Sequence, residues 1–82
     1  MNYTLIYKKK ALKFIQKQDR VQQKRLIEAI EKLPYGDIVP VEGTDEYRLR
    51  VGHYRVIFSI NDDKLIITVI NIGNRGQIYN RY

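Results

Sequence analysis

The spacing of hydrophobic residues predicts a strand followed by a helix at the start of the chain. Residues 2–7 alternate weakly between apolar and polar side chains, which is typical of a short strand. From Lys8 onwards the period lengthens to three or four. The residues expected on the buried face of this helix are Ala11, Phe14, Ile15 and Gln18. Lysines occupy most of the remaining surface, so we expect one face on the core and the other in solvent.

A second helix is predicted to begin at Asp19. Gln22 follows three residues later, and this Asp-x-x-Gln spacing is a variant of the capping box found at helix starts. The apolar stripe of this helix is Leu26, Ile30 and Leu33. Pro34 then ends the helix, because the residue before a proline is disfavoured in helical geometry. Two helices joined with almost no connection form a helical hairpin.

After Pro40 the hydrophobic period shortens to two, which predicts three antiparallel strands. They lie within residues 46–51, 54–60 and 65–72, separated by a Gly-His turn and an Asn-Asp-Asp turn. The segment between Pro34 and Pro40 is expected to be a loop. We therefore predict a single domain of residues 1–82 with the order β-α-α-β-β-β. Its fold is α+β, with a helical hairpin packed on one face of a twisted, mainly antiparallel sheet.

The first hairpin turn decides which side chains share a face of the sheet. If Gly52-His53 is a two-residue type II′ loop, then Arg50 lies opposite Arg55 and Arg48 lies opposite Ile57. The core face then carries Tyr47, Leu49, Val51, Tyr54, Val56 and Phe58. The opposite face carries Glu46, Arg48, Arg50 and Arg55. This grouping depends on register, because a slip of one residue would move the arginines apart.

Opposed arginines predict a site for an anion. Like charges directly opposite destabilise a strand pair by up to about 1 kcal/mol. Guanidinium groups bind phosphate oxygens through paired hydrogen bonds, which gives such a cluster a use. The alternative is a solvated face on which long side chains spread apart and are screened by salt. The formal charge of +6, from 15 Lys+Arg against 9 Asp+Glu, also favours an anionic partner.

The last ten residues interleave basic and aromatic side chains. Arg75 lies in a Gly-Asn-Arg-Gly segment, and Tyr79, Arg81 and Tyr82 follow. Bases stack on aromatic rings while arginines hold the backbone, so this pattern suits single-stranded RNA. For Tyr82, packing on the core is the favoured alternative.

Several other kinds of site are excluded by composition. There is no cysteine and one histidine, so neither a disulfide nor a zinc-type ligand cluster is expected, and a reducing cytoplasm is the simplest location. No phosphate-binding glycine loop opens a helix. The first ten residues do not predict a signal peptide, and no apolar run approaches the length of a membrane span. We expect no metal, no cofactor and no membrane partner.

The chain resembles the RelE/ParE toxin superfamily over nearly its whole length. The most specific segments are Tyr-Arg-Leu-Arg-Val-Gly-His-Tyr-Arg-Val-Ile-Phe at 47–58 and Ile-Gly-Asn-Arg followed by Ile-Tyr at 72–79. In RelE toxins, basic residues occupy the positions that match Arg48 and Arg50. Arginines occupy those that match Arg55 and Arg75, and a tyrosine occupies the one that matches Tyr79. The family's order of elements is the order predicted above.

The resemblance implies a toxin of a type II toxin-antitoxin system in a bacterial or archaeal cytoplasm. RelE-type toxins are endoribonucleases that cut mRNA in the ribosomal A site without a metal, by attack of the 2′-hydroxyl on the adjacent phosphate. The arginines at 48, 50 and 55 would then bind phosphate and stabilise charge. Arg75 would act near the leaving group, and Tyr79 would stack on or orient a base. The implied partners are the ribosome, mRNA and a cognate antitoxin with an acidic segment.

One departure from the family concerns the general base. The best-known RelE type has lysines where this chain has Arg48 and Arg50, and an arginine cannot in practice give up its proton. Glu46, His53 or ribosomal RNA could supply the base instead. Two further functions stay open: a ParE-like toxin that poisons DNA gyrase, and a non-catalytic RNA- or ribosome-binding module. The complete set of matching residues favours the ribonuclease, because ParE-type proteins need not keep it.

Overall fold

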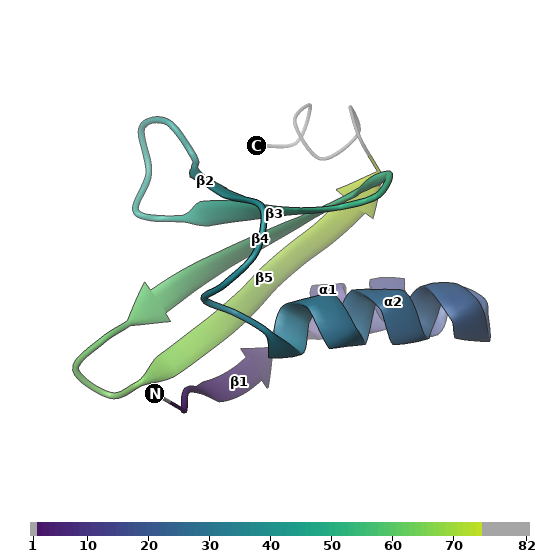
Figure 1. The fold of residues 1–82 in the computed structure, drawn as a ribbon, viewed down its shortest axis with the longest axis horizontal. Helices are drawn as coiled ribbons and strands as arrows, with labels where there is room; N and C mark the ends of the chain where they lie inside the picture. The colour runs from purple at the N-terminus through teal and green to yellow at the C-terminus, as the bar shows by residue number, and fades with distance from the viewer. Residues whose placement is uncertain (1, 75–82) are drawn as a thin grey trace.

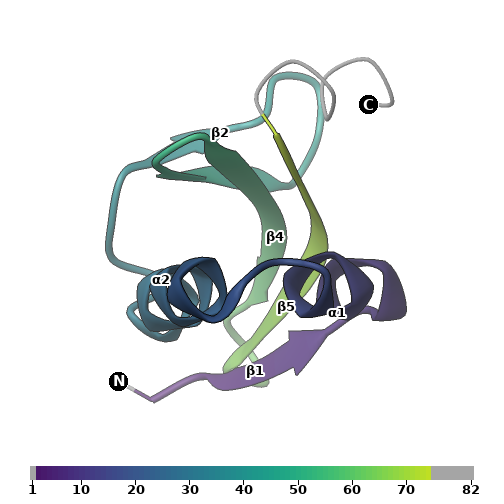
Figure 2. The ribbon, with the colours of Figure 1, turned by 90° about the vertical axis from the view of Figure 1, so that its right-hand side faces the viewer.

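A helical hairpin covers one face of a mixed sheet in the computed structural model, which describes residues 2–74 (Figures 1 and 2). The elements are β1 (Thr4–Tyr7), α1 (Lys9–Gln16), α2 (Arg20–Glu31), β2 (Ile38–Pro40), β3 (Tyr47–Val51), β4 (Tyr54–Asn61) and β5 (Ile66–Asn74). Within this part of the chain the strand order is β1-β5-β4-β3-β2. β1 runs parallel to β5, and the other neighbours are antiparallel. The predicted α+β fold is confirmed.

The two helices begin where the sequence predicts and bury the predicted faces. Asp19 caps α2, since its side-chain oxygen accepts a hydrogen bond from the backbone nitrogen of Gln22 at 2.9 Å. The buried residues of the two helices are Ala11, Ile15, Leu26 and Ile30. α1 packs mainly against β5, and α2 contacts β3. Figure 2 shows both helices on the same face of the sheet.

The segment after Pro34, predicted from the sequence to be a loop, contains a strand. Ile38–Pro40 forms β2 and pairs with β3, with Pro40 opposite Tyr47. A strand of 3 residues is too short to show a period of two, and its proline is tolerated because β2 lies at the edge of the sheet. The predicted strands and helices follow one another in the predicted order, and β2 is an additional strand at the edge of the sheet.

The predicted hairpin register is confirmed. Arg50 lies opposite Arg55 and Arg48 opposite Ile57, around a turn in which Gly52 has a φ of 58°. His53 does not have a positive φ, which agrees with a type II′ turn. The apolar residues of the other face join the core, where the Tyr47 and Phe58 rings stack at 5.6 Å and Phe14 meets Tyr54 edge to face at 5.7 Å.

A register shift divides β5 into two parts. Ile57 of β4 lies opposite Asn71, but the next residue, Phe58, lies opposite Val69, so Ile70 is an extra residue on β5. β1 accompanies only the first part, because its last residue, Tyr7, pairs with Val69. The second part of β5 therefore runs beyond the end of β1, where the chain has already turned into α1.

Candidate nucleic-acid interface

The two opposed arginines of the β3–β4 hairpin differ sharply in exposure. The Arg50 side chain is 58% exposed, whereas Arg55 as a whole is 6% exposed. Both occupy the sheet face that the helices leave uncovered, since their strand neighbours Leu49 and Val56 belong to the core. Arg50 is thus exposed to solvent, whereas Arg55 lies below the surface.

Arg50 is held by a residue that the sequence analysis did not identify. Its Nε donates to Oδ2 of Asp37 at 2.8 Å, and its backbone nitrogen donates to the Asp37 carbonyl oxygen at 2.9 Å. Asp37 directly precedes β2, so the contact depends on the pairing of β2 with β3. No local spacing in the sequence could have revealed it. Because Asp37 engages Nε, the two terminal nitrogens of Arg50 are the donors best placed for an incoming phosphate.

Arg55 carries a largely buried positive charge. Its Nη1 donates to the carbonyl oxygen of Tyr54 at 3.1 Å, and no carboxylate within residues 2–74 forms an ion pair with it. Buried cations are normally paired, because removing a charge from water is unfavourable unless an opposite charge compensates it. This position therefore favours binding of an anion.

Arg48 completes the arginine face beside an apolar residue. It is half-buried and lies opposite Ile57, which is 1% exposed although it does not belong to the main core cluster. The arginine face, defined as Arg48, Arg50, Arg55 and Ile57, therefore presents mainly Arg50 and Arg48 to solvent, because Ile57 is buried. Such a surface suits a ligand that carries phosphates.

A further guanidinium reaches the turn of the same hairpin from α2. A Cβ atom at Gly52 would lie 3.3 Å from Cζ of Arg25, so that side chain lies over the turn. The helical period gives no indication of this contact, which was missed in the sequence. His53 is exposed in the same turn and lies two positions before Arg55. The turn end of the hairpin therefore gathers three arginines and the single histidine.

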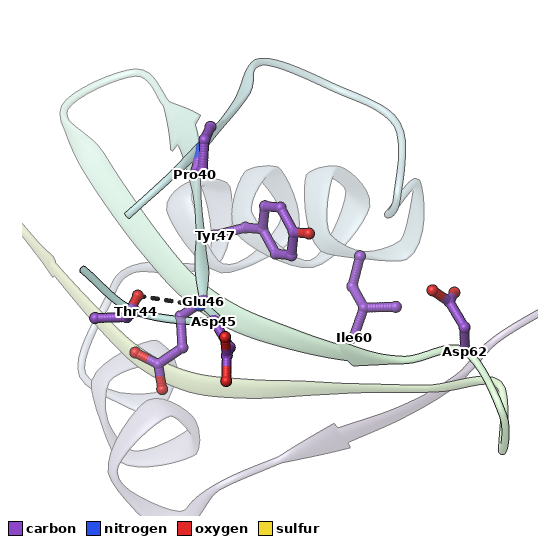
Figure 3. A pocket seen from close by; sticks show the side chains of 7 residues that line it. All are labelled: Pro40, Thr44, Asp45, Glu46, Tyr47, Ile60 and Asp62. Carbon is purple, nitrogen blue, oxygen red and sulfur yellow. Dashed lines mark hydrogen bonds between the residues drawn. The ribbon is translucent and has the colours of Figure 1, made fainter. Parts of the chain in front are cut away.

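Glu46 lies at the opposite end of the hairpin, one residue before β3 begins. It lines a depression of about 350 Å³ together with Pro40, Thr44, Asp45, Tyr47, Ile60 and Asp62 (Figure 3). Figure 3 shows Tyr47 pointing toward Ile60, whereas Asp45 and Glu46 turn to a different side. Glu46 shares strand parity with Arg50, but four residues of strand separate them by about 13 Å.

The other predicted site residues lie outside the described residues. These are Arg75 and Tyr79, together with Arg81 and Tyr82 of the same tail. β5 ends at Asn74, which pairs with Tyr54 next to the β3–β4 turn (Figure 1). Arg75 follows Asn74 directly in the sequence. Within residues 2–74 there is no group of three or more histidines or acidic residues that could hold a metal ion.

Comparison of the sequence with known families and proteins gives two matches. The sequence model of the ParE toxin of the parDE type II toxin-antitoxin system matches residues 5–79. A RelE-like toxin protein of Escherichia coli is 26% identical over 88 residues, which cover 98% of this chain and 93% of that protein.

Solved structures with the same fold include archaeal toxins bound to their antitoxins. A chain of the RelE–RelB complex from Pyrococcus horikoshii has a TM-score of 0.79 and 31% identity, and the alignment covers 94% of this chain and 99% of that one. A chain of the RelB–RelE complex from Methanococcus jannaschii has a TM-score of 0.74 and 25% identity, covering 94% and 98%. The fold derived above is therefore the fold found in these complexes.

Proposed function

Because the chain belongs to the ParE toxin family of type II toxin-antitoxin systems, within the RelE/ParE superfamily, we propose that it arrests translation by cutting mRNA on the ribosome. The observation that carries this proposal is the opposed pair of Arg50 and Arg55 on the sheet face opposite α1 and α2. One guanidinium is exposed and the other is buried without a carboxylate partner among residues 2–74. A phosphate is the anion that both groups can share.

The proposed reaction needs a base, cations and an acid. The base removes the proton from the 2′-hydroxyl, whose oxygen attacks the adjacent phosphorus. The bond from phosphorus to the 5′-oxygen then breaks and the acid donates a proton to that oxygen, leaving a cyclic phosphate on one fragment and a 5′-hydroxyl on the other. Negative charge grows on the phosphate oxygens and on the leaving oxygen, so prepositioned donors accelerate the step. None of these requirements calls for a metal ion.

The arginine face would supply the cations. The terminal nitrogens of Arg50 and the guanidinium of Arg48 would grip the phosphate from the exposed side, and Arg55 would stabilise its growing charge from below. The resemblance assigns Arg75 to the leaving group and Tyr79 to a base of the mRNA. Those two roles stay predictions, since both residues lie outside the described part of the chain.

We assign the general base to His53 in preference to Glu46. Arginine is excluded because it stays protonated. His53 lies in the turn beside the opposed pair Arg50 and Arg55. Glu46 lies two residues from Arg48 but about 13 Å from Arg50 along the strand, beside other carboxylates. Histidine is also the side chain whose ordinary titration range includes neutral pH.

The partner that controls the toxin would be a cognate antitoxin. The Pyrococcus and Methanococcus relatives were solved as complexes of RelE with RelB. A toxin that cuts mRNA needs such a partner, and the basic arginine face suits an acidic segment that is disordered when free. Ribosomes and mRNA place the proposed activity in the cytoplasm. No helix within residues 2–74 is long and apolar enough to cross a membrane.

A second candidate function is poisoning of DNA gyrase. The observation that favours it is the family match itself, because the matching sequence model describes ParE toxins. The arginine face would then contact protein or DNA, and mRNA would stay intact.

A cell-free translation reaction distinguishes the two functions. We would add the purified chain, map new 5′ ends by primer extension, and run Arg75→Ala and Lys24→Gln in parallel. The ribonuclease predicts cuts inside codons at the ribosomal A site, absent from naked mRNA, lost in Arg75→Ala and kept in Lys24→Gln. Intact mRNA together with inhibited gyrase supercoiling would replace it with the second function.

A further inference from the structure

A groove lined by lysines lies between α1 and β5. Its volume is about 230 Å³, and its lining consists of Lys10, Lys13, Phe14, Lys17, Asn71 and Ile72. The three lysines stand at positions i, i+3 and i+7, so they follow one side of α1 over about 10 Å. This lysine groove lies at the part of β5 that β1 does not accompany.

The lysine groove adjoins the arginine face through the sheet. Asn71 pairs with Ile57 of β4, and Ile57 pairs with Arg48 of β3. Two strand spacings, about 10 Å, therefore separate Asn71 from Arg48. In the neighbouring set of cross-strand pairs, Gly73 lies opposite Arg55 and Arg55 lies opposite Arg50. A strand of nucleic acid on the arginine face would reach the groove within a few nucleotides.

Among residues 2–74, no acidic side chain compensates the charge of the lysine groove. None lines it, and no carboxylate in this part of the chain forms an ion pair with its lysines. The first turn of α1 contains no acidic residue, although acidic side chains are favoured there. Lys13 and Lys17 are four residues apart, a spacing at which like charges repel along a helix. An external anion would relieve all of these unfavourable terms.

We propose that the lysine groove binds phosphates of an RNA backbone next to the segment held on the arginine face. This inference rests on the proposed function, because it takes RNA as the ligand. Lysine is a flexible point charge without the paired geometry of arginine, so the groove adds affinity and fixes the path of the backbone without reading bases. The phosphates come either from the same mRNA strand or from structured ribosomal RNA.

The test compares two matched double variants of the full chain. Lys13→Gln with Lys17→Gln removes charge from the groove, and Lys24→Gln with Lys32→Gln removes the same charge from exposed positions of α2 and its C-cap. Fluorescence anisotropy measures binding of oligouridine of about five and about fifteen nucleotides, lengths that span common single-strand site sizes. A sedimentation assay measures binding to purified ribosomes. Arg50→Ala serves as the reference for the arginine face.

We expect the groove variant to weaken binding of the longer oligouridine about 3- to 10-fold, with the shorter one unchanged. The slope of log affinity against log salt should fall by about 1.4, or about 0.7 for each lost phosphate contact. Loss of ribosome binding with unchanged oligouridine binding would identify ribosomal RNA as the source. The α2 variant should match the wild type in every assay.

Two results would overturn the proposal. One is equal RNA and ribosome binding by the groove variant and the α2 variant while Arg50→Ala weakens binding, which would leave the proposed function intact. The other is that the groove variant loses more of its binding to polyglutamate than of its binding to RNA, which would make the groove a site for an acidic peptide. If the wild type binds neither RNA probe nor ribosomes, the proposed function itself is wrong.

Discussion

The two ends of the β3–β4 hairpin carry opposite charge on the same pair of strands. At the turn end lie Arg50, Arg55, His53 and, from α2, Arg25. At the open end lie Asp45, Glu46 and Asp62 around a shallow depression. A field sorted in this way attracts a phosphate chain to one end and repels it from the other. Under the proposed function, the hairpin would therefore orient an RNA strand before any close contact forms.

The two ends also differ in how their charges are accommodated. At the open end Asp62 is exposed and accepts a hydrogen bond from the Tyr3 hydroxyl at 2.8 Å. At the turn end Arg55 is buried with a carbonyl oxygen as its hydrogen-bond partner. Unfavourable electrostatics retained at one end of an otherwise consistent hairpin indicates function rather than folding. Substitutions at the two ends of the hairpin test this difference.

Arg55→Met should separate activity from stability. We expect mRNA cleavage to fall by about 100-fold or more, the usual loss when one donor to a growing charge is removed. The melting temperature should not fall, because an apolar side chain of similar length replaces a buried charge that has no carboxylate partner among residues 2–74. Thermal unfolding and cleavage assays on the same preparation measure both. A large drop in melting temperature would assign Arg55 a structural role.

His53→Gln and Glu46→Gln compare the two ends as sources of the general base. Removing the base should cost about 100-fold in cleavage rate, so His53→Gln should show this loss and Glu46→Gln should stay within about threefold of wild type. Single-turnover cleavage of ribosome-bound mRNA measures both rates. The reverse ranking would move the base to the acidic end, and two small effects would assign it to the ribosome.

Gly52→Ala should destabilise the turn end by about 1 to 2 kcal/mol, because Gly52 has a φ of 58° and a side chain is strained there. For a domain of this size, 1 kcal/mol corresponds to a fall of about 4–8 °C in melting temperature. The Arg25→Ala background provides the control, since it removes the contact that the new Cβ would make at 3.3 Å. If Gly52→Ala destabilises the Arg25→Ala variant by the same amount as the wild type, the destabilisation arises from the backbone conformation.

Asp37→Asn should have a small effect. The Arg50–Asp37 ion pair is more than half exposed on both sides, and exposed pairs contribute about 0.2–1 kcal/mol. We therefore expect cleavage to change about two- to threefold, while Arg50→Ala lowers it at least tenfold. Asp37→Glu should restore the wild-type rate. A loss in Asp37→Asn as large as that in Arg50→Ala would show that Asp37 itself takes part in the reaction.

Tyr3→Phe should change how stability depends on pH, because its difference from the wild type should be present near neutral pH and shrink at alkaline pH. The hydrogen bond to Asp62 raises the pKa of Tyr3 above its ordinary value. Tyr3 then loses its proton at lower pH in the unfolded chain than in the folded protein, so the stability it contributes is lost as pH rises past about 10. Tyr3→Phe should lose less of its urea midpoint between pH 8 and pH 11 than the wild type. Equal losses would contradict this account.

The sequence predicted those features that depend on short spacings. The Asp19 cap and the Gly52-His53 turn are local, and the turn alone determines that Arg50 meets Arg55. β2 was not predicted because it is 3 residues long and ends in proline. The Asp37–Arg50 contact was missed for the same reason, since Asp37 directly precedes β2. The position of Arg25 and the burial of Arg55 depend on how distant elements pack, which no period in the sequence encodes.

Removing one charge from each end of the hairpin tests whether the turn end holds the phosphate chain. The assay is single-turnover cleavage of ribosome-bound mRNA by the wild type, by Arg50→Gln and by Asp45→Asn, with circular dichroism to confirm folding. We expect Arg50→Gln to lose at least about tenfold in rate, the loss expected when a donor to the phosphate is removed. Asp45→Asn should cut at the wild-type rate or slightly faster. Equal loss in both variants, or no cleavage by the folded wild type, would contradict the account.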